Sequence, residues 1–133
     1  MIPSTEDRQA VIDYRKERAY LSLKEAEFVA SGNFWNLAAN RLYYSAFYIC
    51  IALLISQGIA ATTHEGVSRM MNLHFIKTGR LTKEDGKLLG QLFRMRKTGD
   101  YDDLTDWDAE EIEPLFPKAK SLVDKIASLI TAS

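Results

Sequence analysis

The sequence contains one cysteine, three prolines and seven glycines, and each of these small numbers excludes something. A lone thiol, Cys50, cannot form an intramolecular disulfide, and its apolar neighbours indicate a buried structural cysteine. The glycines stand singly, so there is no glycine-rich phosphate loop. No run alternates apolar and polar positions with β-branched residues, as a half-buried strand would. Strand-based folds and disulfide scaffolds are therefore not indicated.

Metal ligands and targeting signals are equally scarce. No glutamate is followed three residues later by histidine, as di-metal helical bundles require, and the two histidines, His64 and His74, lack matched partners. We therefore expect no metal and no other cofactor. The N-terminus lacks the basic and apolar layout of a signal peptide, and the apolar stretch 42–55 is too short to span a membrane. A cytoplasmic protein without membrane contacts is expected.

Helical periodicity, in contrast, runs through nearly the whole chain. Apolar residues recur at three- and four-residue spacing in five segments, at about 4–30, 33–57, 62–78, from 82 past 93, and from about 108 onward. The second segment is apolar on nearly all sides, which predicts a central helix surrounded by the others. A chain of 133 residues fits one domain. The sequence predicts an all-α, up-down bundle of about five helices over residues 1–133.

Polar residues that cap helices mark where each segment begins. The predicted N-caps are Ser4 or Thr5, Asn33, Thr62, Thr82 and Asp108. Thr62 with Glu65, and Asp108 with Glu111, have the spacing of a capping box. Gly58 and Gly79 are expected to close the second and third helices. Pro114 and Pro117 interrupt the last segment without touching its apolar stripe, so a kink or break is expected there.

Charge is distributed unevenly although the net charge is only −1. Residues 64–98 carry eight basic and three acidic residues, whereas residues 99–113 carry eight acids and no base. Such runs are typical of solvated faces, but they also fit a basic groove that binds phosphates beside an acidic wall.

Three arginines differ in their predicted surroundings. Arg94 lies on the polar face of the fourth segment, so it is expected to face solvent. Arg96 follows Phe93 by three residues at the edge of the apolar stripe, where a guanidinium needs a partner. That partner is an acid among residues 100–103 or an external anion. Arg41 shares a face with Tyr44 inside the apolar second segment, which fits an internal salt bridge or a polar binding spot.

Several segments together resemble the HEPN domain family. They are "NRLYYSAFYICIALL" (40–54), "THEGV" (63–67), "HFIKTGRL" (74–81) and "RMRKTGDYDDL" (94–104), and the resemblance covers about residues 14–130. It implies a bundle of about five helices that pairs as a homodimer. Many family members are toxins partnered with a minimal nucleotidyltransferase. Active members are metal-independent ribonucleases with an Arg-x4–6-His motif, and the motifs of both chains meet in one cleft.

This chain departs from the motif. Counting from Arg96, Tyr101 stands where the histidine is expected; counting from Arg94, Gly99 does. Tyrosine titrates near pH 10 and is a poor proton acceptor at neutral pH, whereas histidine titrates near pH 6.5. Tyr101 can still bond a phosphate or stack on a base, and His64 could replace the missing histidine if the fold brings it close.

Three hypotheses follow. The first is a homodimeric module that binds a nucleotide or RNA and works with a nucleotidyltransferase. The second is a weak or altered ribonuclease, using Arg96 with Tyr101 or His64. The third is a DNA-binding helix-turn-helix around residues 77–82, whose recognition helix would begin unfavourably with two acids, Glu84 and Asp85. The candidate binding residues are Arg41, Tyr44, His64, Arg94, Arg96 and Tyr101, and the candidate catalytic residues are Arg96 and Tyr101.

Overall fold

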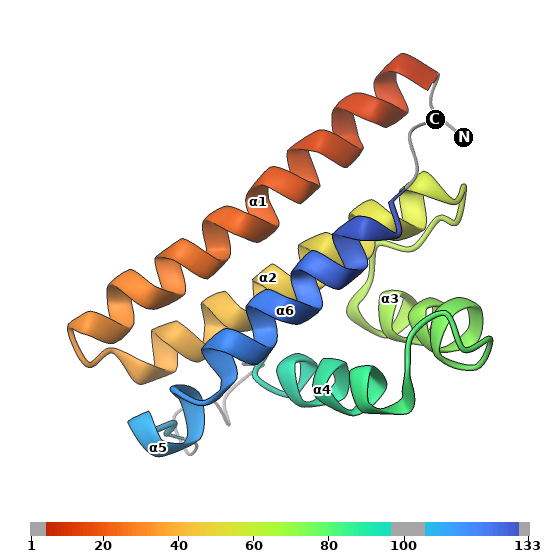
Figure 1. The fold of residues 1–133 in the computed structure, drawn as a ribbon. Helices are drawn as coiled ribbons and strands as arrows, with labels where there is room; N and C mark the ends of the chain where they lie inside the picture. Colours follow the sequence, from red (N-terminus) through yellow and green to blue (C-terminus); the bar gives the residue numbers. More distant parts are fainter. Residues whose placement is uncertain (1–4, 97–105, 131–133) are drawn as a thin grey trace.

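A computed structural model describes residues 5–96 and 106–130 (Figure 1). Within these ranges every regular element is helical, in the order α1 (Thr5–Ser31), α2 (Trp35–Ser56), α3 (His64–Met71), the π-helical turn η1 (Asn72–Ile76), α4 (Lys83–Phe93), α5 (Ala109–Ile112) and α6 (Leu115–Ser128). The all-α prediction is confirmed. The five predicted segments are present, with α3 continuing into η1 and the last segment divided into α5 and α6.

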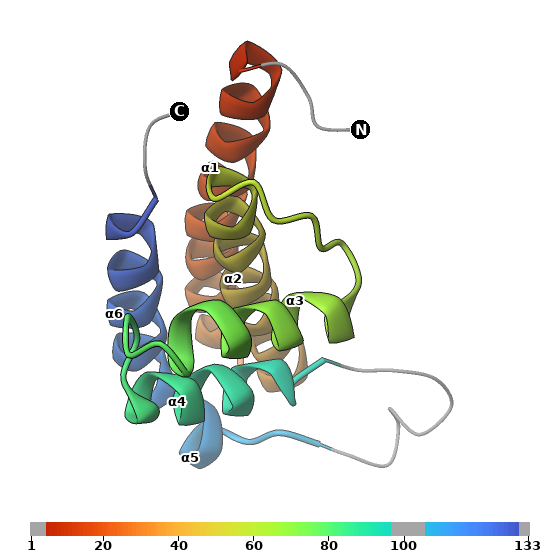
Figure 2. The ribbon, with the colours of Figure 1, turned by 90° about the vertical axis from the view of Figure 1, so that its right-hand side faces the viewer.

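Helix α2 forms the centre of the molecule. It contacts α1, α3, α4, α5 and α6. In Figure 2, α1, α2 and α6 stand side by side, and α3 and α4 lie across them. Although α2 is long and apolar enough to cross a membrane, 67% of its most apolar window is buried inside the bundle. It is therefore a core helix, as its apolar circumference predicts.

The first helix covers one side of α2. Its buried stripe includes Ile12, Ala19, Ser22, Leu23 and Ala26. The small alanines let the two helix backbones approach closely. Figure 1 shows α1 along one edge of the bundle, so its opposite side faces solvent.

The turn between α1 and α2 differs from the prediction that Asn33 caps α2. Phe34 is the N-cap residue and no side chain caps this end. Asn33 has a φ of 67°, its N–H donates to Ala30 O, and the N–H of Phe34 donates to Val29 O. This pattern is a Schellman motif, in which Asn33 supplies the left-handed residue that closes α1. The prediction was wrong because asparagine favours both positions.

The other helix ends agree with the sequence to within about two residues. Thr82 and Asp108 cap α4 and α5, each with a complete capping box. Helix α3 begins one residue later than predicted, because Thr63 rather than Thr62 accepts the N–H of Gly66. Gly58 and Gly79 both adopt positive φ, as closing residues require. The predicted cap at Ser4 lies outside the described residues.

The break in the last segment falls at Pro114, which is the N-cap of α6. Pro117 lies in the first turn of α6, where its missing N–H removes no helical hydrogen bond. The apolar face continues across the break, since Ile112, Leu115, Ala119 and Leu122 are all buried. The prediction of a broken helix with a continuous core face is confirmed.

Candidate phosphate-binding site

The start of α3 and the end of α4 meet beside the middle of α2. His64 is the first residue of α3, directly after the Thr63 cap, and Phe93 is the last residue of α4. Their rings lie 5.4 Å apart, and the His64 ring lies 5.6 Å from that of Tyr43 on α2. Residues from α2, α3 and α4 thus surround the His64 imidazole, and we call this place, together with Arg96, the His64–Arg96 corner.

A part-buried hydrogen bond from a core tyrosine orients His64. The Tyr43 hydroxyl lies 3.0 Å from Nδ1 of His64, and Tyr43 is 2% exposed. Burial raises the pKa of the Tyr43 phenol to about 12, so the phenol keeps its proton. The imidazole is the one hydrogen-bond partner of this hydroxyl in the part of the chain described. Because a poorly exposed O–H favours a conformation in which it donates, we assign Nδ1 as the acceptor, which leaves the imidazole hydrogen on Nε2.

Arg96 lies beyond the last turn of α4 and brings positive charge to the same corner. Its charge lowers the pKa values of both His64 and Tyr43, although burial has the larger effect on each. For His64 burial also acts downward, so the imidazole is neutral at neutral pH. Among the described residues the Arg96 guanidinium has one weak ion pair, 3.9 Å from Glu65, and its side chain is 39% exposed. It is therefore available to an anion.

The position of Arg96 corrects one expectation. The apolar stripe predicted a partly buried guanidinium, but Met95, at 2% exposure, occupies the buried position after Phe93. The α-helical spacing fails here because α4 ends at Phe93 and the chain turns away. The predicted acidic partners at 100–103 lie outside the described residues, as does Tyr101. Arg94 is exposed, as predicted.

Arg41 and Tyr44 form a neighbouring cluster. The Arg41 guanidinium lies 4.9 Å from the centre of the Tyr44 ring and 3.4 Å from the Glu25 carboxylate on α1. The internal salt bridge considered for Arg41 is thus present. Tyr44 contacts Tyr43 edge to face at 4.8 Å, which joins this cluster to the His64 corner through adjacent rings.

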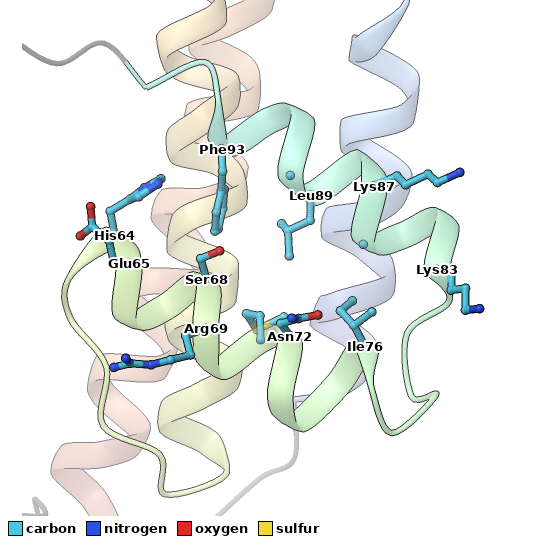
Figure 3. A pocket seen from close by; sticks show the side chains of 13 residues that line it. His64, Glu65, Ser68, Arg69, Asn72, Ile76, Lys83, Lys87, Leu89 and Phe93 are labelled. Carbon is cyan, nitrogen blue, oxygen red and sulfur yellow. The ribbon is translucent and has the colours of Figure 1, made fainter.

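A groove between α3–η1 and α4 opens beside His64 (Figure 3). Its volume is about 750 Å³, and its floor includes Ile76, Leu89 and Phe93. Gly86 on α4 allows close packing against Ile76, since a Cβ at this position would lie 3.2 Å from the Ile76 side chain. In Figure 3, Ser68 and Phe93 project into the space between the helices.

Cations border this groove on both sides. Arg69 lies on α3, and Lys83 and Lys87 lie on α4. Lys87 has one ion pair, with Glu84 at 3.9 Å, and within residues 5–96 and 106–130 Arg69 and Lys83 have no acidic partner. The uneven charge of residues 64–98 is therefore partly gathered around one groove. In the same ranges, no three side chains of the His, Cys, Asp and Glu type gather as metal ligands would.

Comparison with known proteins decides the family. The HEPN domain model matches residues 12–129. The chain belongs to the HEPN domain family. This finding confirms the resemblance in the sequence, and it leaves the helix-turn-helix interpretation without a supporting observation.

The HEPN chain also has curated relatives along most of its length. A UPF0332 protein of Thermotoga maritima is 36% identical over 93% of this chain and 94% of the relative. Two proteins of Methanocaldococcus jannaschii bear the name "Putative toxin". One is 35% identical over 82% of this chain and 74% of its own length, and the other is 29% identical over 91% and 87%. The HEPN protein is therefore related to proteins named as toxins.

Tyr43 and Glu65 are site residues that the sequence did not single out. Tyr43 lies next to Tyr44 in "RLYYSAF", and periodicity places Tyr43 in the core without indicating a hydrogen bond. Because the histidine partner lies 21 residues further along, only the fold brings the two side chains together.

Proposed function

We propose that this HEPN protein binds the phosphate groups of RNA or a nucleotide at the His64–Arg96 corner and does not cleave them efficiently. The observation that carries the proposal is the hydrogen bond from Tyr43 to Nδ1 of His64. It leaves the imidazole as an N–H donor at Nε2. A neutral N–H donor beside a guanidinium suits a phosphate oxygen, but it cannot take the proton of a 2′-hydroxyl.

The groove extends this site to a longer ligand. Arg69, Lys83 and Lys87 border it, and its far end reaches His64. Cations along a groove attract a phosphodiester backbone, while the apolar side chains and the Phe93 ring accommodate bases. Single-stranded RNA fits these requirements better than a rigid duplex, because its bases are free to turn toward the floor.

The setting of this function follows from the family and the named relatives. We propose a cytoplasmic homodimer, with residues 1–133 as one HEPN domain, working with a minimal nucleotidyltransferase in a toxin–antitoxin-like pair. The two "Putative toxin" relatives support the pairing. Arg94, Arg41 and Tyr44 remain proposed binding residues, as does Tyr101, which lies outside the described residues.

Fluorescence anisotropy with a labelled single-stranded RNA of about twelve nucleotides tests the proposal. Arg96→Ala is expected to weaken binding roughly tenfold or more, since hydrogen bonds to charged groups contribute about 1.5–3 kcal/mol. Lys118→Ala is the control, because Lys118 is an exposed cation on α6 that lies outside the groove and the proposed binding residues. Equal losses in both variants would show that general attraction, not the His64–Arg96 corner, binds the RNA.

A second function, a weak ribonuclease, is favoured by the fact that the fold brings His64 under the influence of Arg96. The same RNA, incubated with the protein and separated on a gel, distinguishes the two. We expect it to remain intact. Cleavage that is lost in His64→Gln and in Arg96→Ala would establish the ribonuclease in place of the binding module.

A further inference from the structure

Most of the strongly exposed large apolar side chains among the described residues lie on α1 or at its turn into α2. On α1 they are Val11, Tyr14, Leu21 and Phe28, with exposed fractions of 38%, 56%, 40% and 79%. They avoid the buried stripe that contacts α2. Exposed apolar side chains gathered along one helix mark an interaction surface more often than scattered exposed residues do.

The spacing of these residues is that of a coiled coil. Tyr14, Leu21 and Phe28 are seven residues apart, and a second set at the same interval contains Val11, Arg18 and Glu25. The two sets alternate at steps of three and four, which is the a/d pattern of a helix that packs along another helix. We call these six residues the α1 seam. It is about 26 Å long at 1.5 Å per residue.

We propose that the α1 seam binds the α1 seam of a second copy of this chain, with the two helices antiparallel. The charged positions of the seam support both the partner and the direction. A parallel pair would place Arg18 against Arg18 of the second copy and Glu25 against Glu25. An antiparallel pair places Arg18 beside Leu21 and Glu25 beside Tyr14, so like charges do not meet.

Residues flanking the seam complement one another in the same arrangement. Glu17 and Lys24 occupy equivalent flanking positions one heptad apart, and both are exposed. In an antiparallel pair these flanking positions face each other, so Glu17 of each copy meets Lys24 of the other, twice by symmetry. In a parallel pair, Glu17 would face Ser22 and Lys24 would face Val29, and neither contact pairs opposite charges.

The end of the seam offers room for a side chain of the second copy. A hollow of about 490 Å³ lies beside Phe28 and is lined by Leu37 and Arg41 of α2. Antiparallel pairing places Val11 of the second copy next to Phe28, at the edge of this hollow. Apolar side chains at both ends of the seam would thus be covered together.

The seam lies on a different helix from the His64–Arg96 corner, although one end of it reaches Arg41, so this inference does not depend on RNA binding at that corner. In Figure 2, α1 lies behind α2, and α3 and α4 lie in front. RNA binding by Arg96 and pairing through α1 are separately testable. The family's shared-cleft dimer would use a different surface.

Disulfide trapping tests the proposal, and the chain suits it because its one natural cysteine, Cys50, is fully buried. The double variant Val11→Cys with Phe28→Cys is expected to form a covalent dimer under mild oxidation, seen on a non-reducing gel. The two new thiols cannot pair within one helix, since they lie about 26 Å apart. Each single variant is expected to stay monomeric on the gel. The control is Leu73→Cys, an exposed apolar position on η1 outside the seam.

Three outcomes would overturn the proposal. If each single variant formed as much covalent dimer as the double variant, the two helices would be parallel. Trapping of the double variant no stronger than that of Leu73→Cys would show that the seam is unpaired. If Leu21→Glu, added to the double variant, left trapping unchanged, the disulfide would reflect random collision. RNA binding measured on the same samples shows separately whether the phosphate site functions.

Discussion

At the scale of single residues, one hydroxyl decides the chemistry of the site. Tyr43 and His64 would each be unremarkable alone, a core phenol and a histidine beside a helix cap. Joined by a hydrogen bond of 3.0 Å, they fix which imidazole nitrogen faces outward. In the proposed function, the distinction between binding and cleaving a phosphodiester therefore depends on Tyr43, a core side chain behind His64.

This arrangement predicts the titration of His64. Its pKa is lowered by burial and then by Arg96, and the hydrogen bond from Tyr43 further favours the neutral form. In Tyr43→Phe we expect the pKa to rise toward 6.5, and long-range proton–nitrogen NMR is expected to show hydrogen on Nε2 in the wild type. His74, which is exposed, serves as the internal control. A wild-type spectrum with hydrogen on Nδ1 would contradict the donor assignment.

The lowered pKa of His64 also determines how the free energy of unfolding depends on pH. A folded-state pKa below that of the unfolded chain means that the unfolded chain takes up the proton first as the pH falls. The contribution of His64 to the free energy of unfolding is therefore complete above about pH 6.5, and decreases below it until the folded-state pKa is reached.

At the scale of secondary structure, periodicity predicted the helices well and their ends less well. Local residues determine the caps of α4 and α5, where Thr82 and Asp108 begin complete capping boxes. Two adjacent threonines, Thr62 and Thr63, are equally good caps by composition, and packing of Val67 and Met71 in the core chooses between them. The Asn33 error has the same origin, because a residue type that serves two positions cannot by itself identify one.

The two threonines give a matched test. Thr63→Ala removes the acceptor for the N–H of Gly66 and is expected to lower the free energy of unfolding by about 1 kcal/mol. Thr62→Ala, one residue earlier and exposed, should change it by less than about half as much. Urea denaturation of both variants measures the difference. Equal effects would contradict the cap assignment.

At the scale of the whole molecule, the core was the most predictable feature and the surfaces the least. The central position of α2 was predictable because a helix with apolar side chains on all sides is stable only when other helices surround it. The His64–Arg96 corner and the groove could not be predicted, because they arise where α3 and α4 cross the long helices. The charge excess of residues 64–98 indicated a basic surface without locating its groove.

Pairing through the α1 seam predicts how thermal stability depends on protein concentration. Association stabilises the folded state by mass action, so Tm should rise as the protein is concentrated. Leu21→Glu should reduce the rise in Tm. Leu73→Glu changes a leucine of similar exposure outside the seam, so the rise in Tm should stay as in the wild type. Differential scanning calorimetry over a hundredfold concentration range measures both. Identical concentration dependence in the two variants would argue against pairing through α1.

The link between Asn36 and Trp107 has a spectroscopic consequence. The backbone N–H of Trp107 donates to Oδ1 of Asn36 at 2.7 Å. Asn36 follows Trp35, the first residue of α2. The chain has two tryptophans, and both pack partly buried against the core at this end of the bundle. Intrinsic fluorescence excited at long wavelength is therefore a local probe of the junction between α2 and the chain entering α5. Its emission would report the opening of that junction separately from the unfolding of α3 and α4.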